Sequence, residues 1–384
     1  MKGGVRKRGS TWSYYFYIGE IDGKKKMKEK GGFKNKTEAE KALRNALYEF
    51  ENSGYLTPKK ITLIQFSLQW LEEYVKPLRK ITTYNRYKEL IEKYISNTIG
   101  TINITDIQSF HVEQLLLSIK KENKISGATL QSIYTILNTI MNRALKLKII
   151  KDNPCKYVER PKRDKFIPDV LEIEEIEKLL NALDLEDRYD YMFNIALKIT
   201  LELGLRRGEL GGLEWTDINF KENTLSIRNN LIYTNGHVEM STPKTFESCR
   251  NIYISEKLIE SFKNLKAKQS VDKSKYGDFY ENNVFNNVDY DLVMKWDNGK
   301  YIHPMYYTNK LTKVIKKAKI DKKVRFHDLR HTNATLLLSQ GVDFKVIQER
   351  LGHEDINTTL NTYSHVNKTM QKNATDKLNS ILDF

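Results

Sequence analysis

The chain has 384 residues, which is long for one domain and predicts two or three, and its 40% of hydrophobic residues excludes a wholly disordered protein. It contains no apolar run of 18 residues and only two cysteines, Cys155 and Cys249, which excludes a transmembrane helix and a disulfide scaffold and favours a cytoplasmic protein without a membrane partner. The 64 Lys and Arg against 49 Asp and Glu give a net charge of +15, which favours a polyanionic partner such as nucleic acid, although a basic surface that only maintains solubility is the alternative.

The beginning of the chain is its most basic part, with 15 Lys and Arg against 7 Asp and Glu in residues 1–60. Residues 12–18 are rich in aromatic and β-branched side chains and predict a strand. An Asp-Gly pair, typical of a hairpin turn, precedes a returning strand at 24–30. Thr37 with Glu40 fits a capping box that opens a helix.

We therefore expect a small three-stranded sheet plus one helix over residues 1–57. Its charge favours a compact DNA-binding module over a charged edge hairpin without a ligand.

A helical region follows. From Thr62 the apolar residues step by three and four, which predicts one helix with an inner face formed by Leu63, Phe66, Trp70 and Tyr74. A second helix is expected from about Thr129 to a stop at Asn153-Pro154, with an inner stripe of Ile133, Ile136, Leu137, Ile140, Ala144 and Leu147. Residues 62–156 thus predict a helical bundle, and the charged, proline-containing stretch 157–169 predicts an exposed linker.

The remainder, residues 170–384, mixes both kinds of element. Helices are expected at 172–183, 189–203, 255–267, 305–318, 327–340, 343–350 and 355–363. Strands are expected near 224–233, 237–242 and 249–254. The predicted fold class is multidomain α+β: a three-stranded sheet with a helix, a helical bundle, and a mainly α domain with a small antiparallel sheet. The tail beyond residue 367 has apolar residues at helical spacing, which can pack on its own core or on a neighbouring protomer.

Four of the seven histidines lie between residues 327 and 365. His327 and His331 have the i, i+4 spacing of a zinc pair, but no third ligand has a familiar spacing, so we expect no metal. An anion site fits better, because His327 and Arg330 lie three apart on one helix face and can donate to one phosphate. Upstream, a helix is expected to end on a left-handed Gly204, and Arg206 at the start of the next helix can face a phosphate or pair with Glu209.

Together these pieces resemble the tyrosine recombinase (phage integrase) family. The motifs that carry the resemblance are GLRRGEL at 204–210, Pro243-Lys244-Thr245 with Ser248 and Arg250, His327-x-x-Arg330, Leu351-Gly352-His353, and Tyr363 ten residues further on. The resemblance is strongest over about 170–366, and it extends to the arm-binding and SAM-like core-binding domains of integrases from phages and conjugative elements. A small departure is Leu203, where the family often has a hydroxyl residue.

The resemblance implies a DNA strand transferase that needs no cofactor. It implies six catalytic residues, namely Arg206, Lys244, His327, Arg330, His353 and the nucleophile Tyr363. Tyr363 is expected to form a 3′-phosphotyrosyl intermediate. Arg207 is expected to be a phosphate or surface contact, Glu209 to support the arginine box, and His331 and His365 to be structural. Tyr306 and Tyr307 are expected to be packing residues.

The implied partners are double-stranded DNA at core and arm sites and three further copies of the chain in a homotetramer; an excisionase or a host DNA-bending protein is a further candidate. The implied location is the cytoplasm of a bacterial cell, on the nucleoid when active. The reaction integrates, and in reverse excises, a mobile element. Two alternatives remain: a type IB-like topoisomerase that acts as a monomer, and a non-catalytic DNA-binding regulator on the same scaffold.

Overall fold

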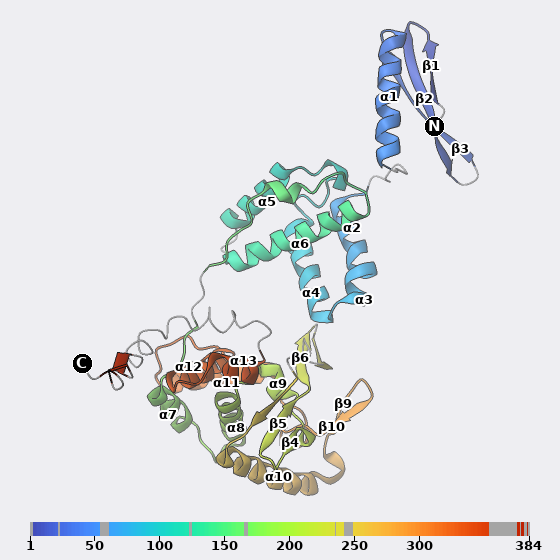
Figure 1. Cartoon of the computed structure of the whole chain (residues 1–384). Coiled ribbons are helices and arrows are strands. Elements are labelled where there is room, and N and C mark those ends of the chain that lie inside the picture. The colour runs from blue at the N-terminus through green and yellow to red at the C-terminus, as the bar shows by residue number, and fades with distance from the viewer. Residues whose placement is uncertain are drawn as a thin grey trace. The chain divides into compact units, whose positions relative to one another are not determined.

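The computed structural model describes residues 3–21, 24–53, 61–122, 125–164, 168–234, 236–241 and 249–352, and in the tail residues 375, 376, 378, 379 and 382. The chain forms two compact units, Met1–Lys165 and Phe166–Phe384 (Figure 1). Among the described residues, every helix is too short or too polar to span a membrane. The expected α+β fold class is confirmed.

The first unit begins with the predicted three-stranded sheet and helix. The elements are β1 (Gly3–Arg8), β2 (Thr11–Ile21), β3 (Lys24–Phe33) and α1 (Lys36–Ser53). The strands are antiparallel in the order β1-β2-β3, and α1 packs along the sheet (Figure 1). Buried Tyr14, Phe16 and Leu43 form the small core between sheet and helix.

The cap predicted for this helix is wrong by two residues. The N–H of Glu38 donates to Asn35 Oδ1 at 2.8 Å, and the Glu38 carboxylate accepts the N–H of Lys34 at 3.0 Å. Thr37 therefore lies inside the first turn. Asn caps a helix as well as Thr does, and Asn35 with Glu38 has the same three-residue spacing as Thr37 with Glu40.

The rest of the first unit is the predicted helical bundle. Its elements are α2 (Leu63–Trp70), a π-helix (Leu71–Val75), α3 (Lys76–Leu78), α4 (Ile81–Leu90), a second π-helix (Ile91–Ile95), a 3₁₀ turn (Ile104–Asp106), α5 (Ser109–Glu122), α6 (Gly127–Lys146) and a 3₁₀ turn (Pro154–Tyr157). Thr62 caps α2 through a capping box with Gln65. One apolar core runs through the bundle.

Two predicted core positions of the bundle are wrong. Tyr74 is 38% exposed and Val75 is 1% exposed, because the π-helix inserts one residue per turn and shifts the inner face by one position. Leu147 is 49% exposed because α6 ends at Lys146, before the predicted stop. The left-handed Lys148, with φ +56°, turns the chain there.

The second unit packs around α8, in which most residues are buried. Its helices are α7 (Ile173–Asn181), α8 (Arg188–Leu203), α9 (Arg207–Gly211), α10 (Glu256–Tyr276), α11 (Pro304–Lys317), α12 (Asp328–Ser339) and α13 (Phe344–Leu351), with 3₁₀ turns at Trp215–Asp217 and Gly277–Phe279. Its strands are β4 (Ile218–Asn219), β5 (Thr224–Ile227), β6 (Asn230–Thr234), β7 (His237–Ser241), β8 (Arg250–Tyr253), β9 (Asn283–Phe285) and β10 (Val288–Tyr290). All are antiparallel, in the groups β4-β5-β8, β6-β7 and β9-β10.

Two of the elements predicted for the second unit differ from those of the structure. The single strand predicted at 224–233 is two strands in two sheets, because Arg228 leaves the sheet to pair with the buried Asp217 at 2.6 Å. The helix predicted at 255–267 extends to Tyr276, since its lysine-rich second half has good helix formers up to Gly277. The helix predicted at 355–363 lies outside the described residues.

Candidate active site

The site is built on the C-terminal end of α8. Gly204 caps this helix in the left-handed conformation, with φ +65°, as the sequence predicts. A Cβ at this position would approach Leu351 Cδ2 to 2.5 Å and Asn333 Oδ1 to 2.9 Å. Glycine is therefore required both by the backbone conformation and by the close packing of α12 and α13.

Side chains from two other helices bind the terminal carbonyls of α8. Asn333 of α12 donates from Nδ2 to the carbonyls of residues 201 and 202 at 2.8 and 2.9 Å. Arg350 of α13 donates to the carbonyl of residue 202 at 3.0 Å, and Arg330 of α12 donates to that of Gly204 at 2.8 Å. The last carbonyls of a helix lack internal partners and carry its negative dipole end, so cationic donors stabilise α8 here.

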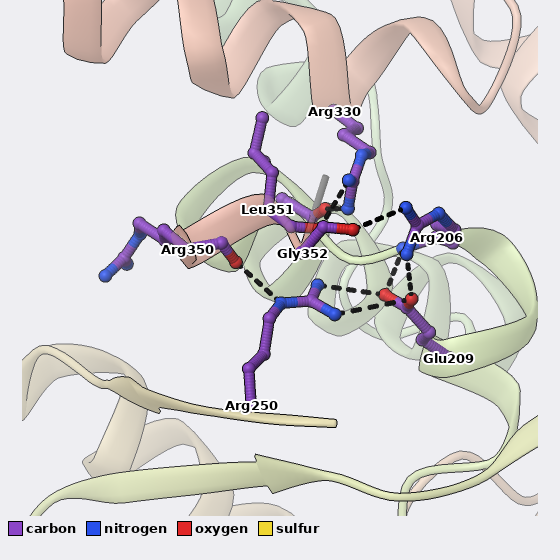
Figure 2. A network of polar contacts seen from close by, with 8 residues as sticks. Arg206, Glu209, Arg250, Arg330, Arg350, Leu351 and Gly352 are labelled. Carbon is purple, nitrogen blue, oxygen red and sulfur yellow. Dashed lines mark hydrogen bonds and ion pairs between the residues drawn. The ribbon is translucent and has the colours of Figure 1, made fainter. Parts of the chain in front are cut away.

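The end of α13 is held by three arginines from three different elements. The carbonyls of residues 350, 351 and 352 are consecutive, and each accepts a hydrogen bond from a different guanidinium (Figure 2). The donors are Arg250 Nε to residue 350 at 2.6 Å, Arg330 Nη2 to residue 351, and Arg206 Nη2 to residue 352 at 3.1 Å. Arg206 and Arg330, 124 positions apart in the sequence, thus meet at one turn.

One carboxylate joins two of these arginines. Glu209 accepts from Arg206 Nη1 at 2.6 Å and from Arg250 Nη2 at 3.1 Å (Figure 2). Its Oε2 also accepts the N–H of Arg206 at 2.9 Å, which closes the first turn of α9. Burial alone would raise the pKa of Glu209, but the charges of Arg250 and Arg206 outweigh it and hold this pKa at about 2. Glu209 therefore stays ionised while 3% exposed.

The arginines differ in their access to solvent. Arg330 is 1% exposed, and its buried charge is tolerated because the carbonyls of Gly204 and Leu351 accept its hydrogen bonds. The Arg206 side chain remains 35% exposed, whereas that of Arg250 is 6% exposed. Arg206 is therefore the member of the cluster with the most open guanidinium.

His327 is the N-cap of α12, and its imidazole contacts that of His331, with ring centroids 5.1 Å apart. The residue as a whole is exposed, but desolvation of its imidazole, aided by the charges of His331, Arg330 and Arg206, lowers its pKa to about 4. His327 is thus neutral at pH 7 and able to accept a proton. Within the described ranges, no group of three His, Cys, Asp or Glu side chains is arranged to hold a metal ion.

Three of the expected catalytic residues, Lys244, His353 and Tyr363, lie outside the described residues, as does His365. The last described residue before His353 is Gly352, which has φ +63° and caps α13 in the left-handed conformation. The glycine of the Leu351-Gly352-His353 motif therefore ends the helix directly before the expected catalytic histidine.

Neighbouring residues with a weaker claim are accounted for by packing. Tyr307 is fully buried, and the Tyr306 hydroxyl donates to the carbonyl of Tyr189 at 2.6 Å, which confirms both as packing residues. Arg207 does not join the arginine cluster and donates to Thr308 Oγ1 of α11 at 2.9 Å.

Two residues of the site were not expected from the sequence. Arg250 appeared only as part of a motif, and Arg350 was not singled out at all. The signal for Arg250 was its place in the motif that begins with Pro243-Lys244-Thr245, but only the fold shows that its side chain reaches Glu209. Nothing in the local sequence marks Arg350, because its acceptor, the carbonyl of Glu202, is 148 positions away.

Family models match three stretches of the chain. The phage integrase family matches residues 169–370, more than half of the chain. An arm DNA-binding domain matches residues 5–50, and the N-terminal SAM-like domain of phage integrases matches residues 62–118.

Individual relatives agree with the family models. The chain is 30% identical over 380 residues to a tyrosine recombinase XerC-like protein of Caldanaerobacter subterraneus subsp. tengcongensis, covering 95% of this chain and 94% of that one. The fold is similar to the Tn1549 transposon integrase (residues 82–397) in complex with transposon right end DNA, with a TM-score of 0.69, 20% identity, and 83% of this chain and 99% of that chain covered. It is also similar to the lambda integrase tetramer bound to a Holliday junction, with a TM-score of 0.58, 16% identity, and 93% and 94% covered.

The family match over more than half of the chain and the near full-length relative agree with the motif order in the sequence. On this evidence the chain belongs to the phage integrase family and is a tyrosine recombinase, an enzyme of site-specific DNA recombination.

Proposed function

We propose that this recombinase cleaves and rejoins DNA through a 3′-phosphotyrosyl intermediate formed by Tyr363. The tyrosine oxygen attacks the scissile phosphorus. The bond between that phosphorus and the 5′-oxygen breaks, and a 5′-hydroxyl leaves. The new phosphodiester conserves the energy of the old one, so rejoining by the reverse step needs no ATP. The observation that supports this best is the meeting of Arg206 and Arg330 on the turn that precedes His353.

In this proposal the two arginines neutralise the phosphate. Negative charge grows on the non-bridging oxygens in the transition state, and guanidinium groups fixed in advance stabilise it without reorganisation. The partly exposed Arg206 is suited to direct contact. Arg330 adds a permanent positive charge close to the same turn.

The remaining three residues move or hold protons and orient the phosphate. A free tyrosine hydroxyl has a pKa of about 10 and attacks poorly at pH 7, so it must lose its proton as attack proceeds. His327, neutral because of its lowered pKa, is able to take that proton. Lys244 is assigned as the acid that protonates the departing 5′-oxygen, and His353 as a hydrogen-bond donor to the phosphate.

The proposed organisation follows the sequence. Residues 1–57 bind arm sites, 62–156 bind the core site, 157–169 link the two units, and 170–384 carry the chemistry and the tail. Four chains act on two duplexes, exchanging one pair of strands and then the other through a four-way junction, to integrate and excise a mobile element in the cytoplasm. An excisionase or a DNA-bending host protein is expected to set the direction. The lambda integrase tetramer on a Holliday junction supports this assembly by similarity of fold.

The test uses a nicked suicide duplex that carries the end-joint sequence of the mobile element encoding this chain, with wild-type and Tyr363→Phe protein in EDTA. A denaturant-resistant protein–DNA adduct formed by the wild type alone is the expected result. No adduct from the wild type, despite demonstrated binding to the duplex, would indicate a DNA-binding regulator. An adduct with Tyr363→Phe would refute the assignment of the nucleophile. A reaction that never yields four-way junctions would favour the topoisomerase.

A further inference from the structure

Arg250 is a single side chain that connects three elements of the site, β8, α9 and α13. It is the first residue of β8, and its side chain is 6% exposed. Its guanidinium binds both oxygens of Glu209 on α9, at 3.4 and 3.1 Å, and the carbonyl of Arg350 on α13 at 2.6 Å. A Cβ on Gly352 would approach Arg250 Nη1 to 3.0 Å, so the end of α13 packs directly against this side chain.

The charges of the cluster do not balance pairwise. Glu209 is one carboxylate between two cations, Arg206 and Arg250, while Arg330 adds a smaller attraction. If Glu209 were paired with Arg206 alone, that pair would be neutral and Arg206 would offer little attraction to a phosphate. Since Arg250 is buried against the same carboxylate, it supplies the resident counter-charge.

We propose that Arg250 is a positioning residue for DNA cleavage, which neutralises Glu209 so that the charge of Arg206 stays available to the scissile phosphate. The same guanidinium fixes the last turn of α13, against which Arg206 donates. Arg250 touches neither substrate nor reacting atoms in this role, which rests on the proposed function of Arg206.

The test compares two suicide duplexes of the same sequence. One has the normal scissile phosphodiester, and in the other a methyl group replaces a non-bridging oxygen, so that the scissile group is neutral. Arg250→Gln is expected to slow adduct formation on the phosphodiester by roughly 10- to 100-fold, less than removal of a direct donor. On the neutral methylphosphonate the loss is expected to be on the order of 10-fold smaller, since less charge has to be stabilised. A partly misfolded enzyme loses rate equally on both.

Two further variants sharpen the result. The quantity to compare is the rate of adduct formation on the phosphodiester divided by the rate on the methylphosphonate. Arg250→Lys keeps the positive charge without the planar fork, so this ratio is expected to return toward the wild-type ratio. Arg228→Gln is the control, because Arg228 also pairs with a buried carboxylate, that of Asp217 at 2.6 Å, but its side chain is 54% exposed and lies outside the arginine cluster. Its ratio is expected to equal that of the wild type.

An unchanged ratio in Arg250→Gln, or an equal change in Arg250→Gln and Arg228→Gln, would overturn the inference. Failure of the proposed function has a different signature, because the wild type itself would then form no adduct on the phosphodiester.

Discussion

Two Arg–Glu–Arg clusters of the same composition occur in the two units of this chain. In the N-terminal sheet, Arg6 and Arg8 bind Glu29, with side chains 40%, 63% and 24% exposed. In the second unit Arg206 and Arg250 bind Glu209, with side chains 35%, 6% and 3% exposed. The first cluster spans the small sheet from β1 to β3, the two strands on either side of β2, whereas the second joins α9 to β8, 41 positions apart in the sequence.

The difference shows that burial, and not composition, gives such a cluster its effect. Exposed ion pairs contribute little, because water and salt screen them. In the second unit Glu209 cannot be hydrated, so its two arginines must stay in place, and their positions become fixed relative to α13. Fixed donors are what phosphoryl transfer requires.

The largest expected difference between the clusters appears on removing the shared carboxylate. Glu209→Gln leaves two neighbouring guanidinium groups without a counter-charge, one of them buried, and should destabilise the second unit by about 3–5 kcal/mol. It should also slow adduct formation, because Arg206 loses the carboxylate that holds its guanidinium in place. Denaturant unfolding of the full-length variant and the suicide-duplex assay measure both effects.

Glu29→Gln is the matched control for stability. Because its cluster is exposed, the unfolding midpoint should move little, and the shift should shrink further in about 1 M salt, where the Debye length is about 3 Å. Equal destabilisation by the two variants would contradict the role assigned to burial.

A smaller difference is expected between two left-handed glycines. Gly204→Ala forces φ +65° on alanine and drives its Cβ into Leu351 and Asn333, which should cost about 1–3 kcal/mol and slow cleavage by displacing α13. Gly9 of the N-terminal sheet has φ +59°, but a Cβ there would meet no other atom within 4 Å. Gly9→Ala should therefore cost only about 1 kcal/mol, from backbone strain alone. Thermal unfolding of both variants measures this, and a larger loss for Gly9→Ala would refute the packing argument.

The last expected difference is a dependence of stability on pH between about 4.5 and 6.5 that comes from the two neighbouring histidines of α12 in the second unit. The pKa of His327 is about 4 when folded and near 6.5 when unfolded, so the unfolded chain binds more protons between these values. The stabilisation is complete above pH 6.5 and is lost as the pH falls toward 4. His331, whose pKa is also lowered by burial, adds a slope of the same sign. Residues 1–57 contain no histidine and should add no slope between pH 4.5 and 6.5.

His327→Gln should flatten part of this slope, as measured by the melting temperature across the same pH range. Loss of stability from Glu209 occurs mostly at lower pH, between about 4.5 and 2, so the slope between pH 4.5 and 6.5 reports the histidines. A melting temperature that rises as the pH falls from 6.5 to 4 would show that the sign is wrong.

The sequence by itself determined the features that depend on local spacing. The left-handed Gly204, the glycine turn after α13 and the three-stranded sheet with its helix follow from residue types within a few positions. The order of the five motifs was enough to identify the family. The wrong predictions arose where two readings of the local sequence were equally good. Asn35, and not Thr37, caps α1, and the π-helix places Val75 instead of Tyr74 on the inner face.

Only the tertiary structure decided which arginines form one cluster. Arg206, Arg250 and Arg330 come from three elements, and what unites them is a row of carbonyls at the end of α13. Helix ends lack internal hydrogen-bond partners, so the fold must bring donors to them from elsewhere. No local pattern encodes that requirement, because the distance between donor and acceptor exists only after α8, α12 and α13 have packed together.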